Sequence, residues 1–139
     1  MNPNLIEISE YTGEGYRPLV DYGQWRVAIL RYIDELLPEN IGKMQRHNET
    51  DEVFVLLNGR CLLFLGEGDE AISAIHAEDM QPFKLYNVKR GAWHSHALDE
   101  AATVLIVENR DTTLANSPEI ELTPDQRRQL IELTRECWR

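Results

Sequence analysis

Two groups of potential metal ligands lie far apart in the sequence: Gln45, His47 and Glu52 form the first, and His94 and His96 the second. Two imidazoles and a carboxylate are a common ligand set for Fe(II), Mn, Ni or Zn, and they leave coordination positions open for a substrate. Residues i and i+2 of a strand share a face, so Gln45 projects with His47, and His94 with His96. We therefore predict that His47, Glu52 and His94 meet as a metal site.

The roles of the neighbouring residues stay open. Gln45 either adds a weak neutral oxygen ligand or hydrogen-bonds the substrate, and His96 either adds a third nitrogen or supports the site structurally. Glu52 and His94 are the candidate catalytic residues, because a buried carboxyl or imidazole with a perturbed pKa is suited to proton transfer. The alternative is a metal-free site, in which the histidines are hydrogen-bonded side chains.

The elements that must position these residues are short strands with turn signals between them. Alternating apolar residues and turns predict eight to ten strands, and hence an all-β sandwich or barrel. The predicted strands are 16–21, 25–33, 41–47, 52–57, 60–65, 71–76, the end of 80–88, 91–97 and 103–107, with a further edge strand at 5–8. Residues 34–40 are expected to form a loop, with or without one helical turn, and 110–121 a polar connector.

Asn58-Gly59 separates two apolar runs, and this dipeptide favours a type I′ turn, in which both residues need a positive φ. We therefore predict that Glu52–Leu57 and Arg60–Leu65 pair as an antiparallel hairpin. His47 and Glu52 would then lie at the entrance to its first strand.

The C-terminal segment differs from the rest. Thr123, Pro124 and Gln126 form a capping-box start, and Leu130, Leu133, Thr134 and Cys137 follow at helical spacing. The sequence predicts one amphipathic α-helix over about residues 123–138. The 139 residues are expected to form a single domain, with the barrel over about residues 16–110.

Composition excludes several classes of function. The net charge of −10 argues against nucleic-acid binding and against anionic membranes, since both need clustered Lys and Arg. The N-terminus has no basic segment followed by an apolar one, and no apolar run is long enough to span a membrane. Cys61 and Cys137 lack a metal or redox spacing, so no disulfide framework is expected and a cytoplasmic location fits.

The two groups of ligands also resemble the motifs of the cupin superfamily of double-stranded β-helix (jelly-roll) proteins. The first motif, G-x5-H-x-H-x3,4-E-x6-G, is matched by His47, Glu52 and Gly59, with Gln45 in place of the first histidine. In the second, G-x5-P-x-G-x2-H-x3-N, Gly91 and His94 match, whereas Lys89 and Leu98 replace the proline and the asparagine. The resemblance covers residues 25–110 and is to small, single-domain, RmlC-like cupins with degenerate motifs.

The resemblance implies a jelly-roll barrel that binds a small polar molecule such as a sugar or an organic acid. The first hypothesis is a metal-dependent isomerase, epimerase or lyase, with Fe(II) dioxygenase chemistry also open and no organic cofactor. The second is a non-catalytic, metal-free module that binds a small molecule. The third is an interaction protein whose output is a homodimer, paired through the N-terminal strands and the C-terminal helix.

Overall fold

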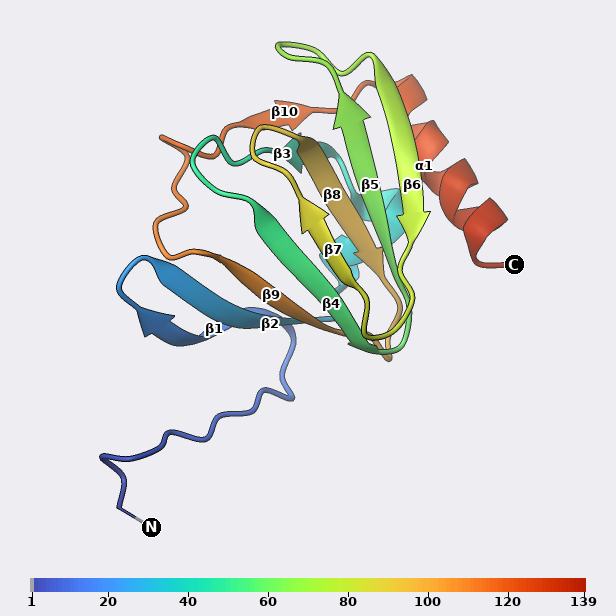
Figure 1. Cartoon of the computed structure of the whole chain (residues 1–139). Coiled ribbons are helices and arrows are strands. Elements are labelled where there is room, and N and C mark those ends of the chain that lie inside the picture. The colour runs from blue at the N-terminus through green and yellow to red at the C-terminus, as the bar shows by residue number, and fades with distance from the viewer. Residues whose placement is uncertain (1) are drawn as a thin grey trace.

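The computed structural model describes residues 2–139, which form ten strands, two short 3-10 helices and one α-helix (Figure 1). The predicted all-β architecture with one C-terminal helix is therefore confirmed. The strands are β1 (Gly15–Tyr22), β2 (Trp25–Arg31), β3 (Lys43–Gln45), β4 (Glu52–Asn58), β5 (Cys61–Glu67), β6 (Ala74–Asp79), β7 (Leu85–Val88), β8 (Trp93–Leu98), β9 (Thr103–Asn109) and β10 (Glu119–Glu121). The helices are η1 (Asp34–Leu36), η2 (Pro38–Asn40) and α1 (Pro124–Cys137).

The strands form two antiparallel five-stranded sheets, in the orders β1-β2-β9-β4-β7 and β10-β3-β8-β5-β6. The two sheets enclose the main core, which is built from alternate residues of the strands. In β9, for example, Val104, Ile106 and Glu108 are buried on the face that points inward, and the residues between them are only half-buried. This period of two places one polar residue, Glu108, on the inward face together with the core residues Val104 and Ile106.

The predicted hairpin at Asn58-Gly59 is wrong. β4 pairs with β7 and β9, and β5 pairs with β6 and β8, so the dipeptide carries the chain from one sheet to the other. Gly59 has a φ of +71°, but Asn58 does not have the positive φ that a type I′ turn requires. The corner is held instead by the Asn58 side chain, which donates to the Ala101 carbonyl, and by the close approach of Gly59 to the backbone of Ala102.

The ends of the strand prediction also need correction. The predicted edge strand at 5–8 is absent, because this segment leads away from the sheets (Figure 1) with Leu5 and Ile8 77% and 84% exposed. The region expected to be a polar connector contains β10, which pairs with β3 and is only three residues long. A three-residue strand with two glutamates has too little periodicity to be recognised in the sequence.

The predicted C-terminal helix is confirmed as α1, which packs on the outer face of the second sheet, beside β5 and β6 (Figure 1). Thr123 and Gln126 form the expected capping box, and Leu130 is fully buried in a second apolar cluster, where it packs with Leu62 and Phe64 of β5. Arg60 donates to the carbonyls of Cys137 and Trp138 and so anchors the end of the helix to β5. No helix among residues 2–139 is long and apolar enough to cross a membrane.

Candidate metal centre and cavity

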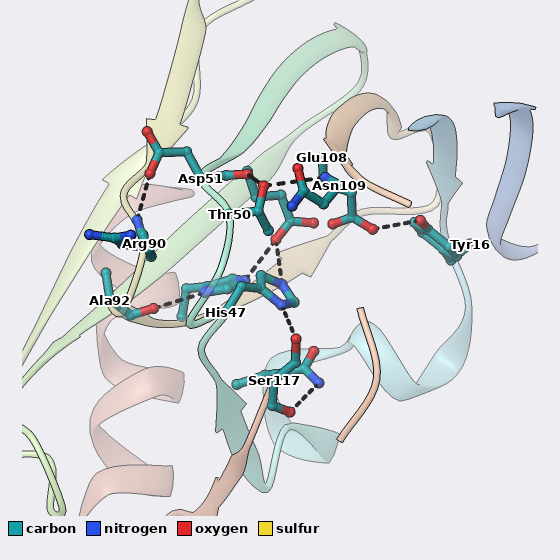
Figure 2. Close-up of polar contacts among 12 residues, drawn as sticks. Tyr16, His47, Thr50, Asp51, Arg90, Ala92, Glu108, Asn109 and Ser117 are labelled. Atoms are coloured by element: carbon teal, nitrogen blue, oxygen red, sulfur yellow. Dashed lines mark hydrogen bonds and ion pairs between the residues drawn. The ribbon is translucent and has the colours of Figure 1, made fainter. Parts of the chain in front are cut away.

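His47, Glu52 and His94 come together between the two sheets, as the sequence predicts. His47 follows β3, Glu52 is the first residue of β4 in the opposite sheet, and His94 lies in β8. The Nε2 atoms of His47 and His94 lie 3.0 Å and 2.9 Å from the same Oε1 atom of Glu52 (Figure 2). All three side chains are buried, with exposures of 5–8%. Two distant stretches of the chain therefore supply one compact N2O cluster.

The tautomer of His94 follows from its second hydrogen bond. Its Nδ1 lies 3.1 Å from the backbone carbonyl of Ala92, which can only accept, so Nδ1 carries the proton. In a neutral ring, Nε2 then holds a lone pair, and this lone pair faces the Glu52 carboxylate.

The tautomer of His47 follows from a longer chain of contacts. Its Nδ1 lies 2.7 Å from Ser117 Oγ, and that hydroxyl donates to Asn116 Oδ1 at 2.9 Å (Figure 2). The amide of Asn116 is oriented by Thr113 N–H on its oxygen and by the Asp111 carbonyl on its nitrogen. Because the hydrogen of Ser117 is already donated, Ser117 accepts from His47 Nδ1–H. His47 Nε2 is then also an unprotonated acceptor in the neutral ring.

With both rings neutral, three acceptor atoms converge at hydrogen-bond distance, an arrangement that a metal ion bound among them would stabilise. The spacing fits a metal ion. Two ligand atoms about 2.1 Å from one ion and at right angles lie ~3.0 Å apart, close to both distances from Glu52. One ligand atom from each of the three residues lies within 4.8 Å of the other two. The fixed Nδ1–H groups also match the way metal-bound histidines are commonly oriented.

Glu108 places a second carboxyl beside the cluster, and its pKa is shifted in the opposite direction to that of Glu52. Burial would raise the pKa of Glu52, but its contacts with His47 and His94 outweigh burial and hold the pKa well below its usual range. Burial and the nearby Glu52 carboxylate raise the pKa of Glu108 to about 9. Tyr16 donates to Glu108 Oε1 at 2.8 Å (Figure 2), and burial and this neighbour raise the tyrosine's own pKa.

The cluster forms part of the lining of a cavity of about 510 Å³. One part of the wall is apolar, and the rest carries polar and charged groups. The volume lies within the range usual for small-molecule sites. The lining residues are Gly15, Tyr16, Arg26, Leu30, Ile33, Glu35, Leu36, Gln45, His47, Glu52, His94, His96, Ile106, Glu108 and Thr112.

Gln45 and His96 lie in the cavity wall, and the structure narrows their roles. Gln45 Nε2 donates to the Ser117 carbonyl at 3.1 Å, so the carboxamide oxygen is the atom left to face a cation or a substrate. His96 is not part of the three-residue cluster. Burial and the neighbouring His94 lower its pKa to about 4, which keeps the ring neutral. His76 is exposed and paired with Glu67, as expected of a surface histidine, and both cysteines are free.

Sequence reasoning missed Tyr16, Glu108 and Ser117. Glu108 could have been found, because it continues the buried parity of Val104 and Ile106 in β9. Tyr16 and Ser117 carry no comparable signal. Tyr16 lies in an edge strand, β1, and Ser117 lies in a loop, so only the tertiary fold brings them to the site.

No protein-family model and no curated protein sequence matches this chain. Solved structures do match, and they share the cupin fold. A cupin-2 domain protein from Shewanella frigidimarina is 18% identical with a TM-score of 0.50 over 72% of this chain and 85% of its own. A variant of Streptomyces PAC13 with uridine is 9% identical with a TM-score of 0.53 over 86% and 96% of the two chains. CapF from Staphylococcus aureus is 16% identical with a TM-score of 0.53, over 81% of this chain but 31% of CapF. The protein is thus a jelly-roll of the cupin type.

Proposed function

We propose that this protein binds a small polar molecule, a sugar or an organic acid, against a divalent transition metal held by His47, Glu52 and His94. The observation that carries the proposal is the convergence of two imidazole Nε2 atoms on one carboxylate oxygen. Two nitrogens and one oxygen suit Fe, Mn, Ni or Zn and leave positions free for a substrate. The reaction class that such a site supports is isomerisation, epimerisation or lyase chemistry.

The cavity supports the choice of a small ligand. Its volume of about 510 Å³ and its mixture of apolar and polar walls suit a small organic molecule such as a sugar or an organic acid. A cupin-fold neighbour, PAC13, holds uridine, which shows that this fold can accommodate a small hydroxylated molecule.

In the proposed mechanism the chain orients the substrate and manages one proton. When bound, the metal ion would polarise a carbonyl or hydroxyl oxygen of the substrate. Glu108, held in place by the Tyr16 hydroxyl, would hydrogen-bond a substrate oxygen and hold or release a proton at its carboxyl. Glu52 and His94, the two catalytic candidates, are engaged with each other and would act as ligands. Leu30 and Ile106 would exclude water from the reacting atoms.

Gln45 would act through its carboxamide oxygen, either as a further neutral ligand or as an acceptor for a substrate hydroxyl. His96, a neutral ring in the same wall, would support the site without binding the metal. Replacing Gln45 by Glu would add a charged ligand of the same length, and tighter metal binding by Gln45→Glu would identify the ligand role.

Metal content tests the proposal. Protein purified without chelator is expected to contain close to one equivalent of transition metal by plasma mass spectrometry. His47→Ala and His94→Ala are expected to lose it, whereas His76→Ala, which removes an exposed histidine, is the matched control and should retain it. Metal-free protein that still binds a small acid or sugar would instead establish the non-catalytic, metal-free module.

The predicted homodimer also remains a proposal. It is supported by the apolar side chains of Leu5, Ile6 and Ile8, which are 50–84% exposed in the segment before β1. Such side chains are the usual material of an interface between copies. Light scattering should give twice the chain mass, and a shorter chain lacking residues 2–9 should give a monomer.

A further inference from the structure

We propose that the outer face of the first sheet, β1-β2-β9-β4-β7, is the surface through which two copies of this chain pair. The inference assigns an interface to the homodimer proposed above and rests on that proposal, but it does not depend on the metal centre. Three observations carry it: the face is apolar, no helix among residues 2–139 covers it, and it is poor in charge.

The central strands of this sheet are apolar on both faces. In β9, Val104 and Ile106 are buried in the core, whereas Leu105 and Val107 alternate with them and point to the outer face. β2 and β4 follow the same pattern. A sheet with one face in water alternates apolar with polar residues, and strands that are apolar throughout are typical of sheets covered on both faces. The composition of these strands therefore indicates a covered outer face.

The register of the strands aligns the outward side chains in two rows, one through Val107 and one through Leu105. The rows consist of Val20, Val27, Val107 and Val53, and of Ile29, Leu105, Val55 and Leu85. Neighbours within a row shield one another, so those at the centre are half-buried, and Leu85 at the end of the second row is 74% exposed. A continuous apolar surface that crosses a whole sheet marks an interaction site.

The second sheet shows how this protein covers an apolar outer face. Leu62 and Phe64 of β5 point outward there, and α1 packs against them with Leu130. Among residues 2–139, no outward residue of the first sheet belongs to either apolar cluster, and α1 lies on the far side of the molecule (Figure 1). The first sheet therefore has an apolar outer face without the cover that α1 gives the second.

The dimensions of the face fit a second copy. Five strands spaced about 4.8 Å apart, with about 3.3 Å per residue over seven residues as in β2 and β9, cover roughly 24 by 23 Å. Two stacked copies would bury roughly 1,100 Å² even as flat surfaces, which exceeds the value of about 1,000 Å² expected of a specific interface. Sheets stack in this way at a spacing of about 10 Å with their strands nearly aligned.

The distribution of charge also favours self-pairing. The chain has a net charge of −10, so most pairs of surfaces on two copies would repel each other. Among the described residues of the five strands, no outward position holds a carboxylate, and the two outward charges are Arg17 and Arg31 in β1 and β2. A two-fold axis parallel to the strands would place β1 of one copy over β7 of its partner, which separates the arginines of the two copies.

The segment before β1 supports the same interface. It leaves the molecule on the side away from α1 (Figure 1), and residues 2–10 are all exposed, although Leu5, Ile6 and Ile8 are apolar. In a dimer stacked on the outer face, this segment of one copy would lie along the partner and bury these side chains. The proposed interface thus accounts for both apolar surfaces at once.

The dissociation constant of the dimer, from sedimentation velocity over a concentration series, tests the interface. Leu105→Lys places a charge at the centre of the face, where pairing would bury it without a partner, and should weaken the dimer about a hundredfold or more. Leu114→Lys is the matched control, since it makes the same change at a loop residue that is 69% exposed, and should leave the dimer unchanged. Val107→Thr keeps the shape and the strand propensity of valine and is the second variant, with an expected weakening of about tenfold.

The outcomes separate the interface from the other proposals. Equally tight dimers of the original protein, Leu105→Lys and Val107→Thr would overturn the interface but leave the homodimer standing, and a monomeric original protein would overturn both. Metal content is a separate outcome: it should not change in Leu105→Lys, because Leu105 points away from the cluster, and its retention shows that the variant folds.

A soluble paramagnetic probe examines the face directly by NMR. The methyl groups of Val27, Val53 and Val107 should be protected from it in the original protein and exposed in monomeric Leu105→Lys. Protection of these methyl groups in a monomer would assign the cover to the chain's own N-terminal segment and overturn the proposal.

Discussion

We predict that the hydroxyl of Ser117 strengthens metal binding at the cluster, although Ser117 is not itself one of the ligands. Ser117 is 1% exposed and links two groups: it accepts from His47 Nδ1 at 2.7 Å and donates to Asn116 at 2.9 Å. Ser117→Ala removes one oxygen atom and little volume. His47 would lose the partner that fixes both its tautomer and the direction of its Nε2 lone pair.

The expected size of this effect follows from the position of Ser117 behind a ligand. Loss of a hydrogen-bond partner of a metal-bound histidine typically weakens metal binding by about 10–100-fold, or roughly 1.4–2.7 kcal/mol. The fold should persist, because leaving the buried Nδ1–H of His47 unpaired costs about 1–3 kcal/mol, less than the stability of roughly 5–15 kcal/mol usual for a domain. Asn116 also keeps a donor on its oxygen, from the Thr113 backbone.

Competition against a chromogenic chelator measures this affinity directly, with Zn²⁺ as the probe and the thermal midpoint as the check on folding. Ser73→Ala is the matched control, since it removes an exposed hydroxyl that donates to the Glu67 carbonyl far from the site. The reasoning is refuted if Ser117→Ala binds Zn²⁺ within about twofold of both the original protein and Ser73→Ala.

Three further predictions concern the framework. Gly59→Ala should destabilise by about 1–3 kcal/mol in urea unfolding, because a Cβ there would meet the Ala102 backbone at 2.5 Å with φ at +71°; an unchanged midpoint would contradict the close approach. Thr123→Ala should cost ~1 kcal/mol by the same method, since it removes the cap of α1, and Thr123→Ser should restore most of it. Arg60→Met should speed hydrogen exchange in the last turn of α1, which its guanidinium holds through two carbonyls, while β5 stays protected; uniform exchange rates would argue against this anchor.

Much of the fold could be predicted because its signals are local. The alternation in β2 and β9 and the capping box at Thr123 depend on neighbours within a few residues, so the sequence reveals them. The pairing of strands depends on residues far apart in the chain, so the local sequence does not reveal it. Asn58-Gly59 favours a hairpin locally, but the inward faces of β4 and β5 are buried in different sheets, and the tertiary packing decides.

The site shows the same division between local and distant information. His47, Glu52 and His94 could be predicted from their spacing, and the structure brings them together. Glu108 required a correct assignment of the inward face of β9. Ser117 could not be predicted, because a lone serine in a loop has no pattern and its role arises only from the meeting of that loop with His47.

The most direct measurement is an anomalous difference map from a crystal grown without chelator, with data collected at the absorption edges of Mn, Fe, Ni and Zn. A metal centre predicts one strong peak, about 2.0–2.2 Å from the Nε2 atoms of both histidines and from a carboxylate oxygen of Glu52. A map without a peak there after soaking in each of these metals, with the two rings still directed at Glu52, would contradict a metal centre and favour the metal-free site of hydrogen-bonded histidines.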